Sequence, residues 1–427
     1  MLRQHMFSRF VCSIKNNPSD FIYVLFYAGI LATLAMVLVN PDEALKVFIF
    51  STALSLPLIG KNIKHVCSNK QNLVLPVMLL LFGLLQIIWV EVFKQSGSAF
   101  TGAYRSYQNG GKVMIFAALV MIALTTREPC ANKTRITSLW TILTAIGLYL
   151  FAGYEAAGAP DIMTYRVALG FEHQTGTAYA LTLIALLASQ AIINLRLKHT
   201  VALYLLHFLI SLAVIITTQT RAAILVYPIL SVGLFLMYYR HNRTMLLRAL
   251  LGFVILVGAA AIPLKPIIES RYQNFLVDLH SYNQNNSNTS IGARLAMQRA
   301  GIESGNGHDW GQSLEQRGAE IQRLAVQDTS LQGALEFINV HLHNEVIDTF
   351  SLKGIPGVVV LLLLYIAMFL TAYWQRSPLL FVISGAIAIY GLSDLLLYAK
   401  GEALSSVLAL CVAAVLSSNP TRERCHG

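Results

Sequence analysis

Long runs of apolar residues constrain this chain more than any other feature of its sequence. A helix of about 20 apolar residues is long enough to cross the ~30 Å hydrocarbon layer of a bilayer. Twelve runs of about this length occur, which indicates a chain that crosses a membrane repeatedly. They lie near residues 21–39, 44–60, 73–93, 112–126, 136–154, 176–194, 200–218, 222–239, 246–264, 355–374, 379–398 and 403–418.

The composition agrees with this interpretation. Hydrophobic residues make up 56% of the 427 residues and charged residues only 12%, with a mean hydropathy of +0.59. A soluble domain has about 25% charged residues. The sequence therefore predicts an all-α, polytopic membrane protein with about twelve transmembrane helices and with both termini on one side.

The net charge of +10 has a topological explanation. Cytoplasmic loops of membrane proteins accumulate lysine and arginine. If the N-terminus is cytoplasmic, every loop on the inside carries such residues, whereas the short loops on the opposite side carry few lysines and arginines. The positive charge is thus explained by the orientation of the chain in the membrane. We therefore expect membrane lipids, and no nucleic acid, as partners. The inside residues are Lys61, Lys64, Lys70, Arg127, Lys133, Arg135, Arg196, Lys198, Arg240, Arg243, Arg248 and Arg376.

One long polar segment interrupts the apolar series and divides the chain. Residues 1–264 hold the first nine predicted helices, residues 265–354 form a large periplasmic loop, and residues 355–427 hold the last three helices and a cytoplasmic tail. The loop contains no cysteine, so it folds without disulfides. Residues 291–300 are typical of a helix, and Ser313 with Gln316 forms a capping-box pattern that predicts a second. The loop is therefore expected to be mainly helical.

The end of this loop has a regular construction. We expect a short helix from Asn344 to Lys353, with Gly354 as its left-handed stop. Pro356 then suits the first turn of the next helix, because backbone N–H groups in the first turn have no hydrogen-bond partner within the helix and the N–H that proline lacks is not needed there. His343 directly precedes this helix, so it would lie at the membrane surface.

Three residues on the outer side are candidates for chemistry. Arg221 stands at the outer start of the eighth predicted span, on the side where positive charge is disfavoured. Arg294 lies near a helix start, where backbone N–H groups and a guanidinium can face one anion. His343 has a side chain that can accept a proton near neutral pH. Each also has an ordinary structural explanation, as a snorkelling arginine, a loop arginine or a surface histidine.

Three further residues could support the site. Asp394 falls inside the eleventh predicted span, where an acid is either functional or a structural partner to an arginine. Arg166 precedes the sixth span, and solvation in a loop explains it equally well. Asn344 follows His343. A metal site built on His341 and His343 is an alternative, but the sequence shows no third ligand of defined geometry, so no metal is predicted.

Two arginines and a histidine on one membrane face suggest the handling of a diphosphate. Arginine binds phosphate oxygens through the fixed, planar arrangement of its N–H groups, and it keeps its charge. It can therefore stabilise a leaving group on which negative charge grows during the reaction. A hydroxyl that attacks must lose a proton, and histidine can take it.

The arrangement resembles the O-antigen ligases of the bacterial inner membrane, within the wider group that includes O-antigen polymerases. Arg221-x3-Leu225 is similar to the R-x3-L element of those ligases, and Arg294 is similar to the arginine of their periplasmic loop. His343-Asn344-x9-Gly354-x2-Gly357 matches their H-[N/S/Q]-x9-G-x2-G signature.

This resemblance implies a membrane-embedded C-type glycosyltransferase that is inverting and needs no metal or other cofactor. It would move a polysaccharide from undecaprenyl diphosphate to a sugar hydroxyl of lipid A–core on the periplasmic face. Arg221 and Arg294 would bind the donor diphosphate, and His343 would act on the acceptor hydroxyl.

Other functions remain open from the sequence. An O-antigen polymerase would use the same donor and a different acceptor, and a protein O-oligosaccharyltransferase would act on protein hydroxyls. A polytopic transporter or flippase has a similar hydropathy profile, but transporters place ionisable groups near the membrane midplane. Here these groups gather at one face, which favours an enzyme.

Overall fold

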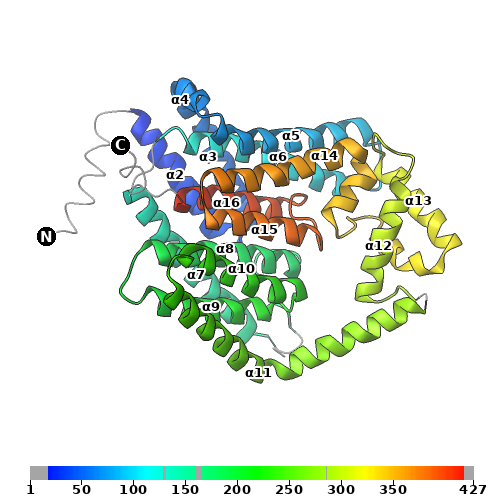
Figure 1. Cartoon of the computed structure of the whole chain (residues 1–427). Coiled ribbons are helices and arrows are strands. Elements are labelled where there is room, and N and C mark those ends of the chain that lie inside the picture. The colour runs from blue at the N-terminus through cyan, green and yellow to red at the C-terminus, as the bar shows by residue number, and fades with distance from the viewer. Residues whose placement is uncertain (1–17, 128–130, 160–164, 285, 418–427) are drawn as a thin grey trace.

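A computed structural model describes residues 18–127, 131–159, 165–284 and 286–417. The predicted cytoplasmic tail after residue 417 lies outside these residues. Within them the chain is helical and contains no strand, as the sequence predicts (Figure 1). The helices are α2 (Pro18–Met36), α3 (Pro41–Lys61), α4 (Ile63–Ser68), α5 (Gln71–Phe93), α6 (Thr101–Leu124), α7 (Ala131–Ala157), α8 (Gln174–Asn194), α9 (Thr200–Thr217), α10 (Arg221–Tyr239), α11 (Arg243–Asn283), α12 (Ser290–Gly305), α13 (Leu314–Gln327), the 3-10 helix η1 (Thr329–Phe337), α14 (Glu345–Trp374), α15 (Pro378–Gly391) and α16 (Lys400–Ser417).

A helix occupies each of the twelve predicted spans. In the described part of the chain, nine helices are long and apolar enough to cross a membrane: α3, α5, α6, α7, α8, α9, α10, α14 and α16. Residues Asp20–Met36 and α15 are apolar but shorter. The chain is thus a polytopic membrane protein, while the count of twelve crossings stays a prediction.

Helix α11 differs from the expected span. Its 41 residues, at 1.5 Å each, extend about 60 Å, which is twice the hydrocarbon thickness. It continues past residue 264, where the polar loop was predicted to begin, so that predicted boundary falls inside a helix. Polarity ends a membrane span without ending a helix, since the backbone hydrogen bonds continue in water. Figure 1 shows α11 running from the bundle to α12.

Two helices form the centre of the bundle. Every residue of α8 from Gly176 to Ile193 is buried, and most of α16 is buried as well. Both pack against several other membrane helices, whereas the outer helices keep exposed apolar side chains such as Leu150 and Ile229. Such side chains are suited to contact with lipid.

Helices α12, α13 and η1 form a separate small core, which we call the loop subdomain (Figure 1, yellow). Thr289 caps α12, and α13 begins with the predicted capping box between Ser313 and Gln316. The helix predicted over 291–300 is confirmed and runs on to Gly305. The core residues are Ala293, Ala296, Met297, Ala300, Ile321, Ala325, Leu331, Ala334, Ile338 and Leu342.

The corner between the loop subdomain and the membrane lies inside α14. Gly354 has φ 61° and ψ −156°, which breaks α14 into a short helix and a long one, as predicted. This conformation is almost restricted to glycine, and it differs from the left-handed helical stop that was expected, whose ψ is near +47°. A Cβ on Gly354 would lie 2.1 Å from the carbonyl oxygen of Asp309.

Gly357 allows a second close approach at this corner. A Cβ at this position would meet the side chains of Lys353 and Thr349 at 2.4 and 3.0 Å. The two glycines of the His343–Gly357 pattern therefore allow the close contacts at the break between the short and long helices. His343 is consequently held at the start of the short helix.

Candidate functional site

His343 lies in a short non-helical turn between η1 and α14. Its φ is +48°, an uncommon value for a residue other than glycine. The side chain of Asn344 follows as N-cap of α14 and accepts hydrogen bonds from the N–H groups of Val346 and Ile347, each at 3.1 Å. Four other non-glycine residues of the described chain share such a φ, so the partners of His343, rather than its backbone alone, distinguish this position.

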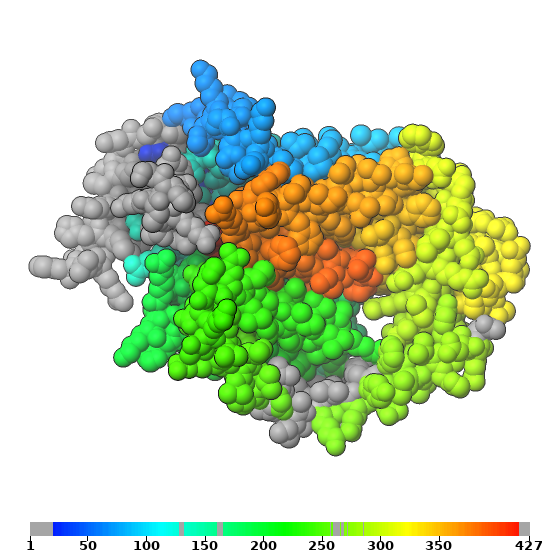
Figure 2. Space-filling model, viewed as in Figure 1, coloured from blue at the N-terminus to red at the C-terminus, as the bar shows by residue number. Residues whose placement is uncertain are grey.

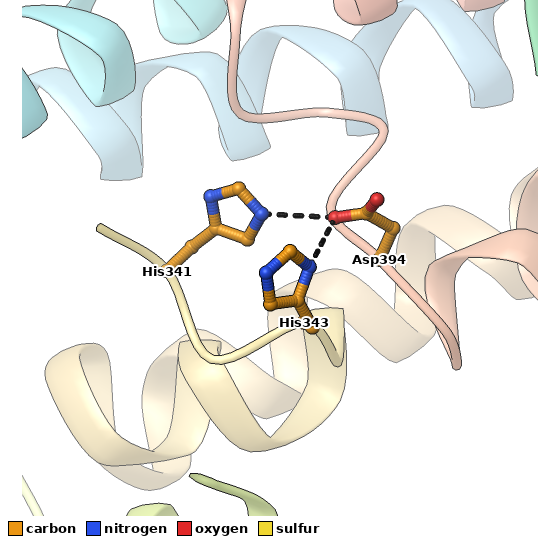
Figure 3. Close-up of side chains that lie close together, drawn as sticks. All are labelled: His341, His343 and Asp394. Atoms are coloured by element: carbon orange, nitrogen blue, oxygen red, sulfur yellow. Dashed lines mark hydrogen bonds and ion pairs between the residues drawn. The ribbon is translucent and has the colours of Figure 1, made fainter. Parts of the chain in front are cut away.

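Both histidines of the turn bind one carboxylate (Figure 3). Asp394 Oδ1 lies 2.9 Å from His341 Nε2 and 3.0 Å from His343 Nδ1. The side chains are only 14%, 17% and 20% exposed for Asp394, His341 and His343. A low-exposure setting strengthens these charge-assisted hydrogen bonds.

The pKa values of the two histidines shift in opposite directions. Burial lowers the pKa of His341, but the hydrogen bond and charge of Asp394 outweigh burial and raise its pKa above the usual 6.5. Burial also lowers the pKa of His343, and here Asp394 only partly offsets it, so the pKa of His343 falls. Burial acts to raise the pKa of Asp394, but the two histidines together hold it well below its usual range. The lowered pKa favours the neutral form of His343, and the raised pKa of His341 favours its charged form beside Asp394.

The loop after α15 carries Asp394 and is tied to the histidine turn. Asn344 Nδ2 donates to the carbonyl of Leu392 at 3.1 Å, and the N–H of Leu397 donates to Glu345 Oε1 at 2.9 Å. Asp394 was predicted inside a span, but α15 ends before it. Its carboxylate accepts from the N–H of Leu395, and such local bonds compete with a helix. Its partners are the histidines rather than an arginine.

His343 and Arg294 line one cavity of about 310 Å³. The cavity lies at the N-terminus of α12, where Asn288, Thr289 and Ser290 also line it, and Phe337 contacts the ring of His343 edge-on. A helix N-terminus with an arginine one turn later suits an anion. Figure 2 shows an open hollow between the yellow-green segment of α11 and α12 and the green and red helices of the bundle.

Arg221 is not among the described residues that line this cavity. Its guanidinium lies 3.9 Å from the carboxylate of Asp278 on α11. Arg166 donates to the carbonyl of Thr218 at 3.0 Å and to Thr220 Oγ1 at 3.4 Å, so it supports the turn before Arg221. The structure thus brings Arg294, His343, Asn344 and Asp394 together and places Arg221 and Arg166 at the start of α10.

The histidine cluster could also hold a metal. The ligand atoms of His341, His343 and Asp394 lie within 4.8 Å of one another. However, both histidines already hydrogen-bond to the same carboxylate oxygen at 2.9 and 3.0 Å, which satisfies that oxygen. A metal would have to replace these bonds with contacts of about 2.0–2.2 Å. One ring nitrogen of the cluster, His341 Nδ1, is buried without a hydrogen-bond partner among the described residues.

Sequence reasoning missed a buried ion pair beside the turn, which lies among four buried charged residues, Arg317, Glu345, Asp348 and Lys353. Arg317 of α13 and Asp348 of α14 form an ion pair at 2.8 Å, and both side chains are fully buried. The one signal was Asp348 itself, an acid in a short helix that enters a membrane. Its partner could not be found, because Arg317 is 31 residues away and resembles any exposed helical arginine.

Comparison with known proteins decides the family. A family model described as O-Antigen ligase matches residues 206–362. An O-antigen ligase of Escherichia coli (strain K12) is 32% identical over 396 residues, which cover 91% of this chain and 92% of that protein. This chain belongs to the O-antigen ligase family. The ligase signature with His343 lies within the matched residues, so the resemblance expected from the sequence is confirmed.

Membership makes the chain an enzyme of ligase or glycosyltransferase type in lipopolysaccharide biosynthesis. Together with its apolar helices it indicates a multi-pass protein of the inner membrane. Family membership does not by itself decide the roles of individual residues.

Proposed function

We propose that this chain is an O-antigen ligase that transfers polysaccharide from undecaprenyl diphosphate to a sugar hydroxyl of lipid A–core. The reaction would take place on the periplasmic face of the inner membrane. The observation that carries the proposal is the cavity where a neutral histidine, held by a carboxylate, faces the same space as Arg294.

The proposed reaction is a single displacement. The acceptor oxygen attacks the anomeric carbon of the donor, and the bond from that carbon to the phosphate oxygen breaks. Undecaprenyl diphosphate leaves with the electron pair, and the configuration inverts. The hydroxyl proton passes to His343 Nε2, because Nδ1 already donates to Asp394.

Each supporting residue has a defined part in this proposal. Asp394 orients the ring of His343 and stabilises the imidazolium as it forms, as a carboxylate partner of a catalytic histidine does. Arg294 and the N-terminus of α12 bind the diphosphate and offset its growing charge. Arg221 would bind the same diphosphate from α10, with Arg166 supporting its turn. Asn344 joins the histidine turn to the loop after α15. The proposed reaction needs no metal.

The test is genetic and biochemical. A deletion strain should lose polymer on lipid A–core and accumulate undecaprenyl-linked polymer, and the unmodified gene should restore attachment. Arg294→Ala, His343→Ala and Arg221→Ala should insert normally and fail to restore it. Normal polymer on the core in all three variants would refute the proposed site.

The same strain separates the alternatives. A core capped by a single repeat unit would indicate a polymerase instead, because attachment would continue while polymer growth stops. Loss of glycan from proteins with normal lipopolysaccharide would indicate a protein O-oligosaccharyltransferase. Undecaprenyl-linked polymer trapped on the cytoplasmic face would indicate a flippase.

A further inference from the structure

Two fully buried charged residues lie outside the cavity and have no part in the reaction described above. Arg317 and Asp348 have 0% exposed side chains. Arginine and aspartate are almost never fully buried unless they are paired, and a buried pair gives little net stability compared with apolar residues of the same size. A role beyond stability therefore has to be sought in their other bonds.

Those bonds converge on the histidine turn. Arg317 Nη2 donates to the carbonyl of Val340 at 2.9 Å, and the N–H of Leu342 donates to Asp348 Oδ1 at 3.1 Å. The backbone is thus fixed immediately before and after His341, and one residue before His343. Leu342 itself is fully buried in the core of the loop subdomain.

The same pair is attached to the membrane bundle. The hydroxyl of Tyr107, on α6, donates to Asp348 Oδ2, and this tyrosine is almost fully buried. Arg317 comes from the loop subdomain and Asp348 from α14. The ion pair therefore connects three parts of the chain at the turn that carries both histidines.

The turn needs such external bonds. It has no helix or strand to fix it, and His343 has a positive φ that persists only where the surroundings impose it. We propose that Arg317 and Asp348 are positioning residues that hold the Val340–Leu342 backbone so that His343 Nδ1 faces Asp394. Neither residue is among those that line the cavity, so they act through His343 rather than on substrate.

This inference rests on the proposed transfer reaction, and it is tested with the purified full-length protein in lipid vesicles. Undecaprenyl-diphosphate-linked glycan and lipid A–core serve as substrates. Asp348→Asn removes the charge that Arg317 binds, and Arg317→Lys keeps a positive charge but loses the fork that reaches both Asp348 and Val340. Each variant should lower kcat about 10- to 100-fold, as small misplacements of a reacting group do, with little change in KM for either substrate.

A double variant separates positioning from simple structural support. If Asp348 acts through the bond between His343 and Asp394, then Asp348→Asn combined with Asp394→Asn should lose much less activity than the product of the two single losses. Independent effects would multiply instead, within about twofold. Multiplied losses, or a raised KM with unchanged kcat, would overturn the inference.

Controls address folding and the choice of residue. Arg299→Lys changes an arginine of the same subdomain that pairs with Asp328 and not with the turn, so it should keep kcat within about twofold of the unmodified protein, the usual range for a surface change. Tyr107→Phe leaves the ion pair intact and removes one bond to Asp348. If the Asp348 and Arg317 variants fail to accumulate, Tyr107→Phe tests the inference in their place. We expect it to lower kcat several-fold, and an unchanged kcat would refute the inference. An unmodified protein that transfers no glycan would overturn the proposed function itself, and this inference with it.

Discussion

Replacing Asp394 by asparagine tests the core of the proposed mechanism. The substitution keeps the size of the side chain and an oxygen that can accept, but removes the charge that both histidines share. We expect kcat to fall about 100-fold. Two magnitudes from the structure bracket this value.

The lower bound comes from the hydrogen bond alone. A hydrogen bond to a charged group contributes ~1.5–3 kcal/mol and a neutral one ~0.5–1.5 kcal/mol; the lower ends of these ranges differ by ~1 kcal/mol, which we take as the lower estimate of the loss. The upper bound is the attraction between the carboxylate and the imidazolium that forms on His343. At 3.0 Å and an effective dielectric constant of about 20, this is on the order of 5 kcal/mol.

His341 binds the same carboxylate oxygen, and this bond reduces the share of that attraction available to His343. The expected loss therefore falls between the bounds. At 1.36 kcal/mol per factor of ten, a loss of ~2.7 kcal/mol corresponds to the expected 100-fold.

The pH dependence gives a second readout. Transfer needs neutral His343, so the rate rises with pH through the lowered pKa of this residue. Asp394 acts to raise that pKa, and its loss should lower the pKa further. The acid limb of the pH–rate profile should therefore move to lower pH in Asp394→Asn, while the plateau falls.

The assay measures initial rates of glycan transfer in vesicles over a range of pH. Asp309→Asn is the matched control, because Asp309 is an exposed aspartate between α12 and α13 and its carboxylate has no part in the site. A plateau within threefold of the unmodified protein, or an acid limb that moves to higher pH, would refute the reasoning.

Three further predictions concern the corner, the second arginine and the metal alternative. Gly354→Ala should destabilise the protein by at least ~2 kcal/mol, because alanine is strained at a φ of 61°, and a lower melting temperature in detergent would show it; an unchanged melting temperature would contradict the proposed corner. Asp278→Asn should lower the KM for the lipid-linked donor by up to about fivefold, because a partly exposed pair contributes ~0–1 kcal/mol and its loss makes Arg221 more available to the diphosphate; a raised KM would count against that role. Transfer should continue in excess chelator, and activity that is lost and then restored by one divalent ion would show that His341 and His343 hold a metal.

The sequence by itself predicted most of the architecture. Apolar runs of membrane length located the helices, because a buried or lipid-facing helix needs such a run wherever it occurs. The capping box at Ser313 and the position of the break at Gly354, though not its backbone conformation, were also predicted correctly, since both depend on residues that are neighbours in the chain. The ligase signature pointed to His343 for the same local reason.

Only the tertiary structure decided how the site is built. His343 and Asp394 are 51 residues apart, and Arg317 and Asp348 are 31 apart, so no local pattern joins them. Asp394 was predicted inside a span because hydropathy averages over neighbours, while the local bond of its carboxylate lies in the loop beyond α15. Hydropathy records how much apolar surface a segment carries, and the positions of buried charges depend on partners that the fold brings from distant parts of the chain.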